Sequence, residues 1–188
     1  MTPKSPQKKT SQPPESPGLD YAAWRALALQ PWLVHLHGNR FASVLAIKGQ
    51  PGEAENKGQP PFFGSDGEAL ESAFVALGWG SNNWCGIALD LPGKGVVSEQ
   101  DLRMLIEIID PTVLLALDRM AALKLKESYG ELLPSIPEPG IMTKLLGRAL
   151  VFVDGFEAAL TSQQEDEAKR RAWQQLKAIK TSPLLSHQ

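Results

Sequence analysis

The chain has 188 residues, 43% of them hydrophobic, which is enough for one domain with a full core and too few for two comfortable ones. Its 19 Lys and Arg residues against 21 Asp and Glu residues give a net charge of −2, without the basic excess typical of a dedicated duplex-DNA binder. No apolar run approaches about 18 residues, and the first residues lack a secretory apolar region, so we expect neither a membrane span nor export. The single cysteine excludes an internal disulfide and fits a cytoplasmic protein.

The sequence divides into a domain and two tails. Residues 1–18 are rich in Pro, Ser and Lys without apolar periodicity, so we predict a disordered, weakly basic tail, either simply solvated or a short electrostatic tether. This tail contains three Lys and one Glu. The rest of the chain therefore has 16 basic and 20 acidic residues, a net charge of −4. We predict one domain over residues 19–181 and a short C-terminal tail over 182–188.

From Asp20 onward, apolar runs alternate with helix signals. In chain order the predicted elements are a helix over 20–29, a strand over 43–47, a helix over 65–77, a strand over 84–89, a helix over 98–109, a strand over 112–117, a helix from 118 through 125, a strand over 149–153 and a helix over 164–180. Such alternation is typical of a parallel sheet covered on both faces. We therefore predict an α/β protein, a three-layer α/β/α sandwich with a four-stranded parallel sheet.

Polar residues mark the predicted helix starts. Asp20, Ser98 and Asp118 each stand where a side-chain oxygen caps a helix. Residues 65–68, Ser-Asp-Gly-Glu, match a capping box. Residues 129–147 are rich in Pro and Gly and are predicted to form a connection.

Residues 51–70, PGEAENKGQPPFFGSDGEAL, carry the most specific pattern in the chain. They resemble the first signature loop of the iron–sulfur (family 4) uracil-DNA glycosylases, PG…G.PF.G..G..L, without a gap. In that family the loop follows the first strand of a parallel sheet and walls the pocket that receives a flipped uracil. The resemblance extends over residues 32–179 and implies a uracil-DNA glycosylase-like fold. Further segments that match in the family's order are Leu77-Gly78 and residues 110–117, 156–160 and 169–177.

The positions that carry the family's chemistry are occupied here by other residues. Gly49 stands at the family's acidic position, and Gln50 beside it cannot act as a base, because an amide does not titrate near neutral pH. The uracil-reading asparagine aligns with Ala88 or Cys85, neither of which offers an amide. The leaving-group histidine aligns with Gly155, which offers no donor to a departing uracil anion. We therefore predict that the site is catalytically degenerate.

Metal and cofactor sites are not expected. Family 4 enzymes hold a four-iron cluster on four cysteines, and Cys85 alone cannot hold one. Cys85 is more simply a buried strand residue. His35 and His37 flank Leu36 without a third ligand, so we predict a surface or core role for both.

The resemblance also predicts a base or ligand pocket. Phe62 aligns with the aromatic residue that stacks on the flipped base; alternatively, it packs the loop against the core. The predicted pocket residues are Gly49, Gln50, Pro51, Gly52, Phe62, Gly155 and Phe156.

Polar residues follow the predicted strands, where ligands bind in parallel α/β sheets. Gln50, Asp90 and Asp154 are the catalytic candidates on this ground. Asp90, Asp118 and Asp154 could together hold a hard cation such as Mg²⁺, or each could cap the helix or turn that follows it.

The leading hypothesis is a binding or assembly module of DNA repair or replication. A related alternative is a replication accessory subunit similar to the psi subunit of bacterial DNA polymerase III, by analogy of fold alone. A second alternative is an active DNA glycosylase for uracil or a deaminated purine with a rearranged site, since carboxylates can assist glycosidic cleavage. A third is a metal-dependent hydrolase that uses the aspartates. The implied partners are weakly bound or single-stranded DNA and a repair or replication protein.

Overall fold

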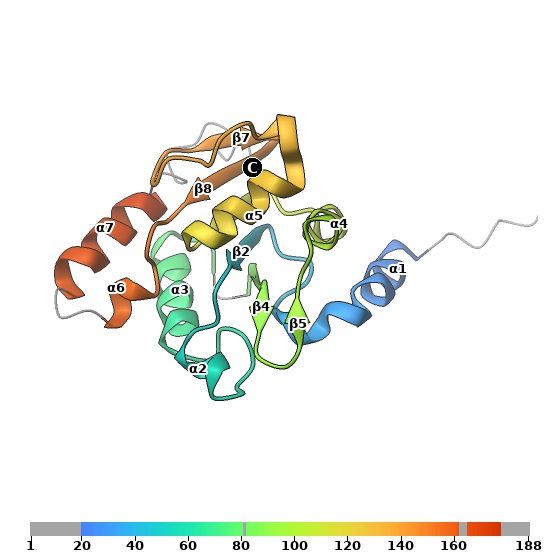
Figure 1. Ribbon diagram of the computed structural model, residues 1–188, viewed down its shortest axis with the longest axis horizontal. Coiled ribbons are helices and arrows are strands. Elements are labelled where there is room, and N and C mark those ends of the chain that lie inside the picture. Colours follow the sequence, from blue (N-terminus) through green and yellow to red (C-terminus); the bar gives the residue numbers. More distant parts are fainter. Residues whose placement is uncertain (1–19, 81, 162–164, 178–188) are drawn as a thin grey trace, which may run out of the picture.

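The computed structural model describes residues 20–80, 82–161 and 165–177 (Figure 1). The strands are β1 (Leu36–Gly38), β2 (Val44–Lys48), β3 (Trp84–Ala88), β4 (Asp90–Leu91), β5 (Gly95–Val96), β6 (Val113–Ala116), β7 (Thr143–Leu145) and β8 (Arg148–Phe152). Six of them form one sheet in the order β1-β3-β2-β6-β8-β7, and β4 pairs with β5 in a separate hairpin. The four middle strands of the sheet run parallel, whereas the edge strands β1 and β7 run antiparallel to their neighbours.

The predicted α/β class is confirmed, but the prediction of a sheet made only of four parallel strands is wrong. The sheet is mixed and six-stranded, because a short antiparallel strand extends each edge. One of these, β7, lies inside the stretch predicted as a connection over residues 129–147. Both edge strands have only three residues, too few for an alternating apolar pattern to be visible in the sequence.

Helices surround the sheet. They are α1 (Tyr21–Ala28), α2 (Glu53–Asn56), α3 (Ser65–Ala76), α4 (Glu99–Ile109), α5 (Arg119–Tyr129), α6 (Ala158–Thr161) and α7 (Glu165–Lys177), with short 3-10 helices η1 (Gln30–His35) and η2 (Gly130–Leu132). Within the described ranges, no helix combines the length and apolar character that a membrane crossing requires. The predicted tails over residues 1–18 and 182–188 lie outside the described residues.

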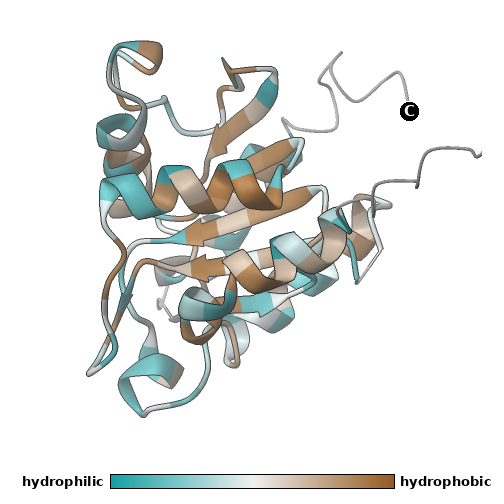
Figure 2. Ribbon diagram, turned by 90° about the vertical axis from the view of Figure 1, so that its right-hand side faces the viewer, coloured by the Kyte–Doolittle hydropathy of each residue, from teal (hydrophilic) through white to brown (hydrophobic). Residues whose placement is uncertain are grey.

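Two apolar cores lie on opposite faces of the sheet. The first joins α4 and α5 to alternate strand residues, with Leu105, Leu125 and Ile47 buried in it. The second joins α3, α6 and α7 to the intervening strand residues, with Phe74 and Leu115 at its centre. Figure 2 shows predominantly apolar strands packed among helices that carry both hydrophilic and hydrophobic residues.

The helix starts agree with three of the four predicted caps. Asp20 accepts hydrogen bonds from two backbone N–H groups of α1, Ser98 accepts one from Asp101, and Asp118 accepts one from Ala121. The capping box predicted at residues 65–68 is wrong: Gly64 is the cap residue of α3, and Ser65 is already helical. Asp66, the second residue of α3, instead accepts a hydrogen bond from the buried Lys48.

Candidate functional site

A cavity of about 150 Å³ with several charged residues in its lining lies where β2 and β6 end and where the chain leaves β8. This is the edge of a parallel sheet at which α/β proteins bind ligands. Its volume is below the range of roughly 300–1,000 Å³ that is usual for ligand pockets, so it suits a small ligand. The lining residues are Lys48, Gln50, Asp66, Leu117, Asp118, Gly155, Phe156 and Glu157.

Lys48, the last residue of β2, is only 3% exposed and lies at the centre of a group of carboxylates. Its Nζ donates hydrogen bonds to Asp66 Oδ2 at 2.6 Å and to Glu55 Oε1 at 2.9 Å. Glu157 Oε2 is farther away, at 3.8 Å. Burial by itself lowers the pKa of Lys48, but the bonds to Asp66 and Glu55 outweigh it, so the pKa is raised and the amine stays charged.

Glu55 organises the loop that follows β2. Besides the bond from Lys48, its carboxylate accepts hydrogen bonds from the backbone N–H groups of Gly52 and Phe62, each at 2.8 Å. Burial alone would raise the pKa of Glu55, whereas the bonds from Lys48 and from the Phe62 N–H lower it below its ordinary value. The two ends of the loop are thus held on one buried, ionised carboxylate.

Asp118 connects this loop to α5. Its Oδ2 accepts a hydrogen bond from the backbone N–H of Gly49 at 2.6 Å, while its Oδ1 caps the helix through the N–H of Ala121 at 2.8 Å. A Cβ added at Gly49 would lie 2.6 Å from Asp118 Oδ1 and 2.5 Å from Met120 Cβ, so only glycine fits. Asp118 therefore acts as a cap and a positioning group for the loop.

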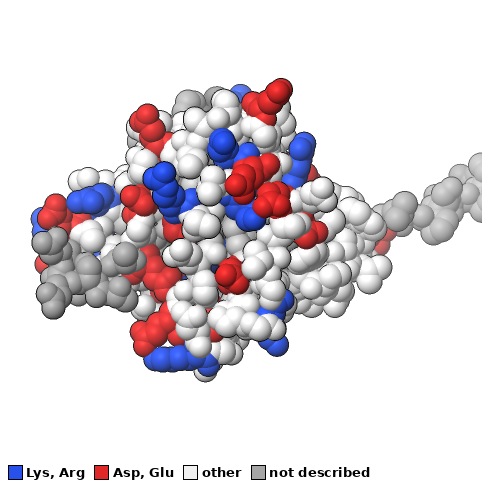
Figure 3. Space-filling view, in the orientation of Figure 1, with Lys and Arg blue, Asp and Glu red and all other residues white. Residues whose placement is uncertain are grey.

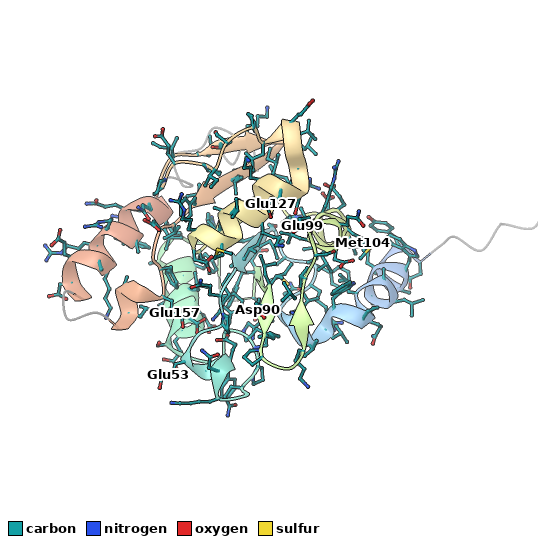
Figure 4. The ribbon with its side chains drawn as sticks, in the orientation of Figure 1. Glu53, Asp90, Glu99, Met104, Glu127 and Glu157 are labelled. Atoms are coloured by element: carbon teal, nitrogen blue, oxygen red, sulfur yellow. The ribbon has the colours of Figure 1, made fainter. Side chains whose placement is uncertain are left out.

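Glu157 is the solvent-reaching carboxylate of the cluster, with its side chain 39% exposed. A Cβ added at Gly52 would lie 1.8 Å from Glu157 Oε1, so the absence of a side chain there makes room for the carboxylate. Partial burial raises the pKa of Glu157, and the negative charges of Asp66 and Glu55 add to this, against the lowering effect of Lys48. Glu157 is therefore the group at the cavity best suited to hold a proton. Figure 4 shows it near Glu53 of α2.

The ring of Phe62 is buried in the protein and is not part of the cavity lining. It packs edge-on against Trp84, with ring centroids 5.6 Å apart, and lies 5.1 Å from Lys48 Nζ. Gly86 makes room for it, because a Cβ there would lie 2.5 Å from the Phe62 ring. Of the two readings of Phe62, this position favours packing over base stacking.

The other predicted site residues fall into two groups. Gln50, Gly155 and Phe156 line the cavity, and Gly49, Pro51 and Gly52 form the adjoining loop. Asp90 and Asp154 do not line it: Asp90 is paired with Val96 in the β4–β5 hairpin, and the Asp154 N–H donates to Gln175.

The described residues contain no group of three or more His, Cys, Asp or Glu arranged to hold a metal ion. The three-aspartate crevice does not form, since Asp118 lines the cavity whereas Asp90 and Asp154 do not. His35 is buried, with Nδ1 2.8 Å from the carbonyl oxygen of Ala88. The ring of His37 lies 5.1 Å from that of Trp84. Both histidines therefore have packing partners.

The charged cluster formed by Lys48, Glu55, Asp66 and Glu157 was not predicted from the sequence. One signal was available: Lys48 ends an otherwise apolar strand, and a buried lysine requires a carboxylate partner. Glu55, 7 positions away, is expected near the strand ends because it lies in the first loop, but no signal pairs it with Lys48. No signal identified Asp66 and Glu157, which lie 18 and 109 positions away along the chain.

The search of protein-family models gave no match to this chain, and the search of curated proteins found no relative.

Proposed function

We propose that this protein is a binding module with a uracil-DNA glycosylase-like fold that acts in DNA repair or replication without breaking glycosidic bonds. The proposal rests on the resemblance of residues 51–70 to the family's pocket loop and on the position of the cavity at the carboxyl edge of the parallel strands. One observation supports the expected absence of cleavage: the ammonium of Lys48 is already bound to Glu55 and Asp66.

Base excision needs a donor or cation that stabilises the departing base as an anion. Among the residues that the structure describes, Lys48 is the one cationic residue of the cavity lining, and its ammonium is bound to two buried carboxylates. Asp66, Asp118 and Glu157 leave the cavity with more acidic than basic groups. An anion in the cavity would therefore be opposed by the surrounding charge.

The test is a single-turnover assay with the protein in excess over oligonucleotides that contain uracil, hypoxanthine or xanthine, both single- and double-stranded. Alkali then cleaves any abasic site, and a gel separates the products. We expect no cleavage above the no-protein control. Salt-dependent binding of the same oligonucleotides without cleavage would support the module. Stoichiometric cleavage would refute it.

A second function is favoured by one observation, the raised pKa of Glu157 at a cavity that the carboxyl group of Asp118 also lines. A carboxyl group with a raised pKa can serve as the acid in glycosidic cleavage, with a second carboxyl group as a charge stabiliser. If the protein is instead an active glycosylase with a rearranged site, the same assay should give a different result. Cleavage would occur, and Glu157→Gln would abolish it while leaving oligonucleotide binding intact.

A further inference from the structure

Exposed aromatic side chains gather around α1, on a part of the molecule that the cavity does not involve. Tyr21 is 59% exposed, Trp24 46% and Phe41 49%. The helix contributes no buried residue to either core. Such a concentration of exposed aromatic surface marks a binding surface more often than a packing element.

Tyr21 and Trp24 stack on each other, and Arg25 links this pair to Phe41. Tyr21 and Trp24 are three positions apart on α1 and therefore share a face, and their rings are nearly parallel, 18° apart, with centroids separated by 5.8 Å. The Arg25 guanidinium lies 5.6 Å from the Tyr21 centroid and 4.8 Å from the Phe41 centroid. Arg25 also donates to the carbonyl oxygen of Ile109, which fixes α1 to the end of α4. We refer to Tyr21, Trp24, Arg25 and Phe41 as the α1 platform.

Arg25 supplies the basic group of the α1 platform, and Asp20 and Asp110 are its acidic neighbours. The two carboxylates beside it are already engaged, since Asp20 caps α1 and Asp110 pairs with Arg148 at 3.0 Å. The 19 residues that precede Asp20 in the sequence contain three Lys and one Glu. Figure 3 shows a largely uncharged surface around α1, with acidic and basic side chains scattered over the rest of this face.

We infer that the α1 platform binds single-stranded nucleic acid through stacking of unpaired bases on Tyr21, Trp24 and Phe41. Proteins that bind single strands without sequence preference combine aromatic platforms, arginine and nearby positive charge in this way. A duplex is excluded from this mode because its base faces are already stacked. The inference does not rest on the function proposed above: α1 and Glu157 lie at opposite sides of the molecule (Figure 4), and binding at α1 is independent of cleavage at the cavity.

The test is fluorescence anisotropy with a labelled thymidine oligonucleotide of about 16 nucleotides, a length that covers one binding site of this type. The wild-type chain is compared with the double variant Tyr21→Leu/Trp24→Leu, which keeps an apolar surface but removes the stacking rings. Leu27→Ala is the matched control, since Leu27 is 71% exposed on the same helix and outside the α1 platform. Circular dichroism verifies that each variant is folded.

We expect the double variant to bind about 5- to 100-fold more weakly than the wild type, with Leu27→Ala unchanged. The wild-type affinity should fall with salt, and an unlabelled duplex should compete poorly. Three outcomes would overturn the inference: no binding by the wild type at low salt, equal affinity for the double variant, or equal competition by duplex. Self-association that depends on Trp24 in sedimentation, without oligonucleotide binding, would also overturn it and assign the surface to a protein contact.

Discussion

The ammonium of Lys48 lies 2.6 Å from Oδ2 of Asp66 in the protein interior, at the carboxyl end of a central strand. Glu55 is its second close partner, at 2.9 Å. This arrangement neutralises the cation of the cavity before any ligand enters. Lys48 is therefore expected to stabilise the fold and the loop over residues 49–64, and not to bind an anion.

Replacing Lys48 should strongly destabilise the protein. Lys48→Met leaves Glu55 and Asp66 buried without their cation, and breaking a buried pair in this way costs about 3–5 kcal/mol. Urea denaturation measures the loss in the free energy of unfolding. The matched control is Lys57→Met, in the same loop, whose exposed pair with Glu53 should contribute less than about 1 kcal/mol.

A triple variant separates the charge effect from the loss of packing. Lys48→Met/Glu55→Gln/Asp66→Asn removes the unpaired charges while keeping similar side-chain volumes, so we expect it to recover a large part of the stability lost in Lys48→Met. A triple variant that is no more stable than the single variant would show that the ion pairs are not the reason for the loss.

Glu157 should make stability depend on pH. Its pKa is raised in the folded protein, so its ionised form is disfavoured on folding, and the folded state gains relative stability as pH falls through that raised pKa. Glu157→Gln mimics the protonated form; it should be more stable than the wild type near pH 7, and the two should converge near the ordinary carboxyl pKa of about 4.3. Denaturation curves over this interval measure the difference. A wild type that is the more stable of the two near pH 7 would contradict the raised pKa.

Glu55 should produce the opposite trend at lower pH. Its pKa is lowered in the folded protein, so its stabilisation is complete above its ordinary pKa of about 4.3 and is lost as pH falls through the lowered value. Glu55→Gln should flatten this acid limb of the stability curve. An unchanged acid limb in Glu55→Gln would show that the carboxylate does not titrate with the fold.

Gly67→Ala should reverse the usual effect of this substitution in a helix. Gly to Ala inside a helix ordinarily stabilises by about 1 kcal/mol, but a Cβ at Gly67 would lie 2.0 Å from the carbonyl oxygen of Phe62. We expect a destabilisation of about 1–3 kcal/mol, measured by chemical denaturation. Ser72→Ala, at an exposed position of the same helix, should be neutral or slightly stabilising. A stabilised Gly67→Ala would mean that the loop is not packed against α3.

Cys85 should be inert in the folded protein. It is fully buried, and desolvation raises the pKa of its thiol to about 12, so almost no thiolate is present near pH 8. Iodoacetamide labelling followed by mass spectrometry should modify Cys85 in urea and leave it unmodified in buffer. Rapid modification in buffer would show that β3 is exposed to solvent.

Much of the central architecture could be predicted from local sequence. The buried run over residues 113–116 forms a single strand, and Ser98 and Asp118 each cap the helix that follows directly in the sequence. Such elements can be recognised from neighbouring residues alone. The edge strand β7 gave no such signal, because its three residues are held by pairing with β8 and not by their own pattern.

The candidate site was harder to predict because it is made by long-range contacts. Glu157 meets Lys48 only after β8 has paired beside β6, and nothing in the residues around Glu157 indicates that partner. The role of Phe62 was also hard to predict. Its alignment with an aromatic residue identifies the position in the loop but not the direction in which the ring points.

The most direct test of the proposed inert cavity is a search for free base. Excess protein is incubated with an oligonucleotide that carries isotope-labelled uracil, from pH 5 to pH 9, and the released base is quantified by mass spectrometry. The engagement of Lys48 and the acidic cavity predict no released uracil at any pH. Stoichiometric release that disappears in Glu157→Gln would contradict this and identify a working glycosylase.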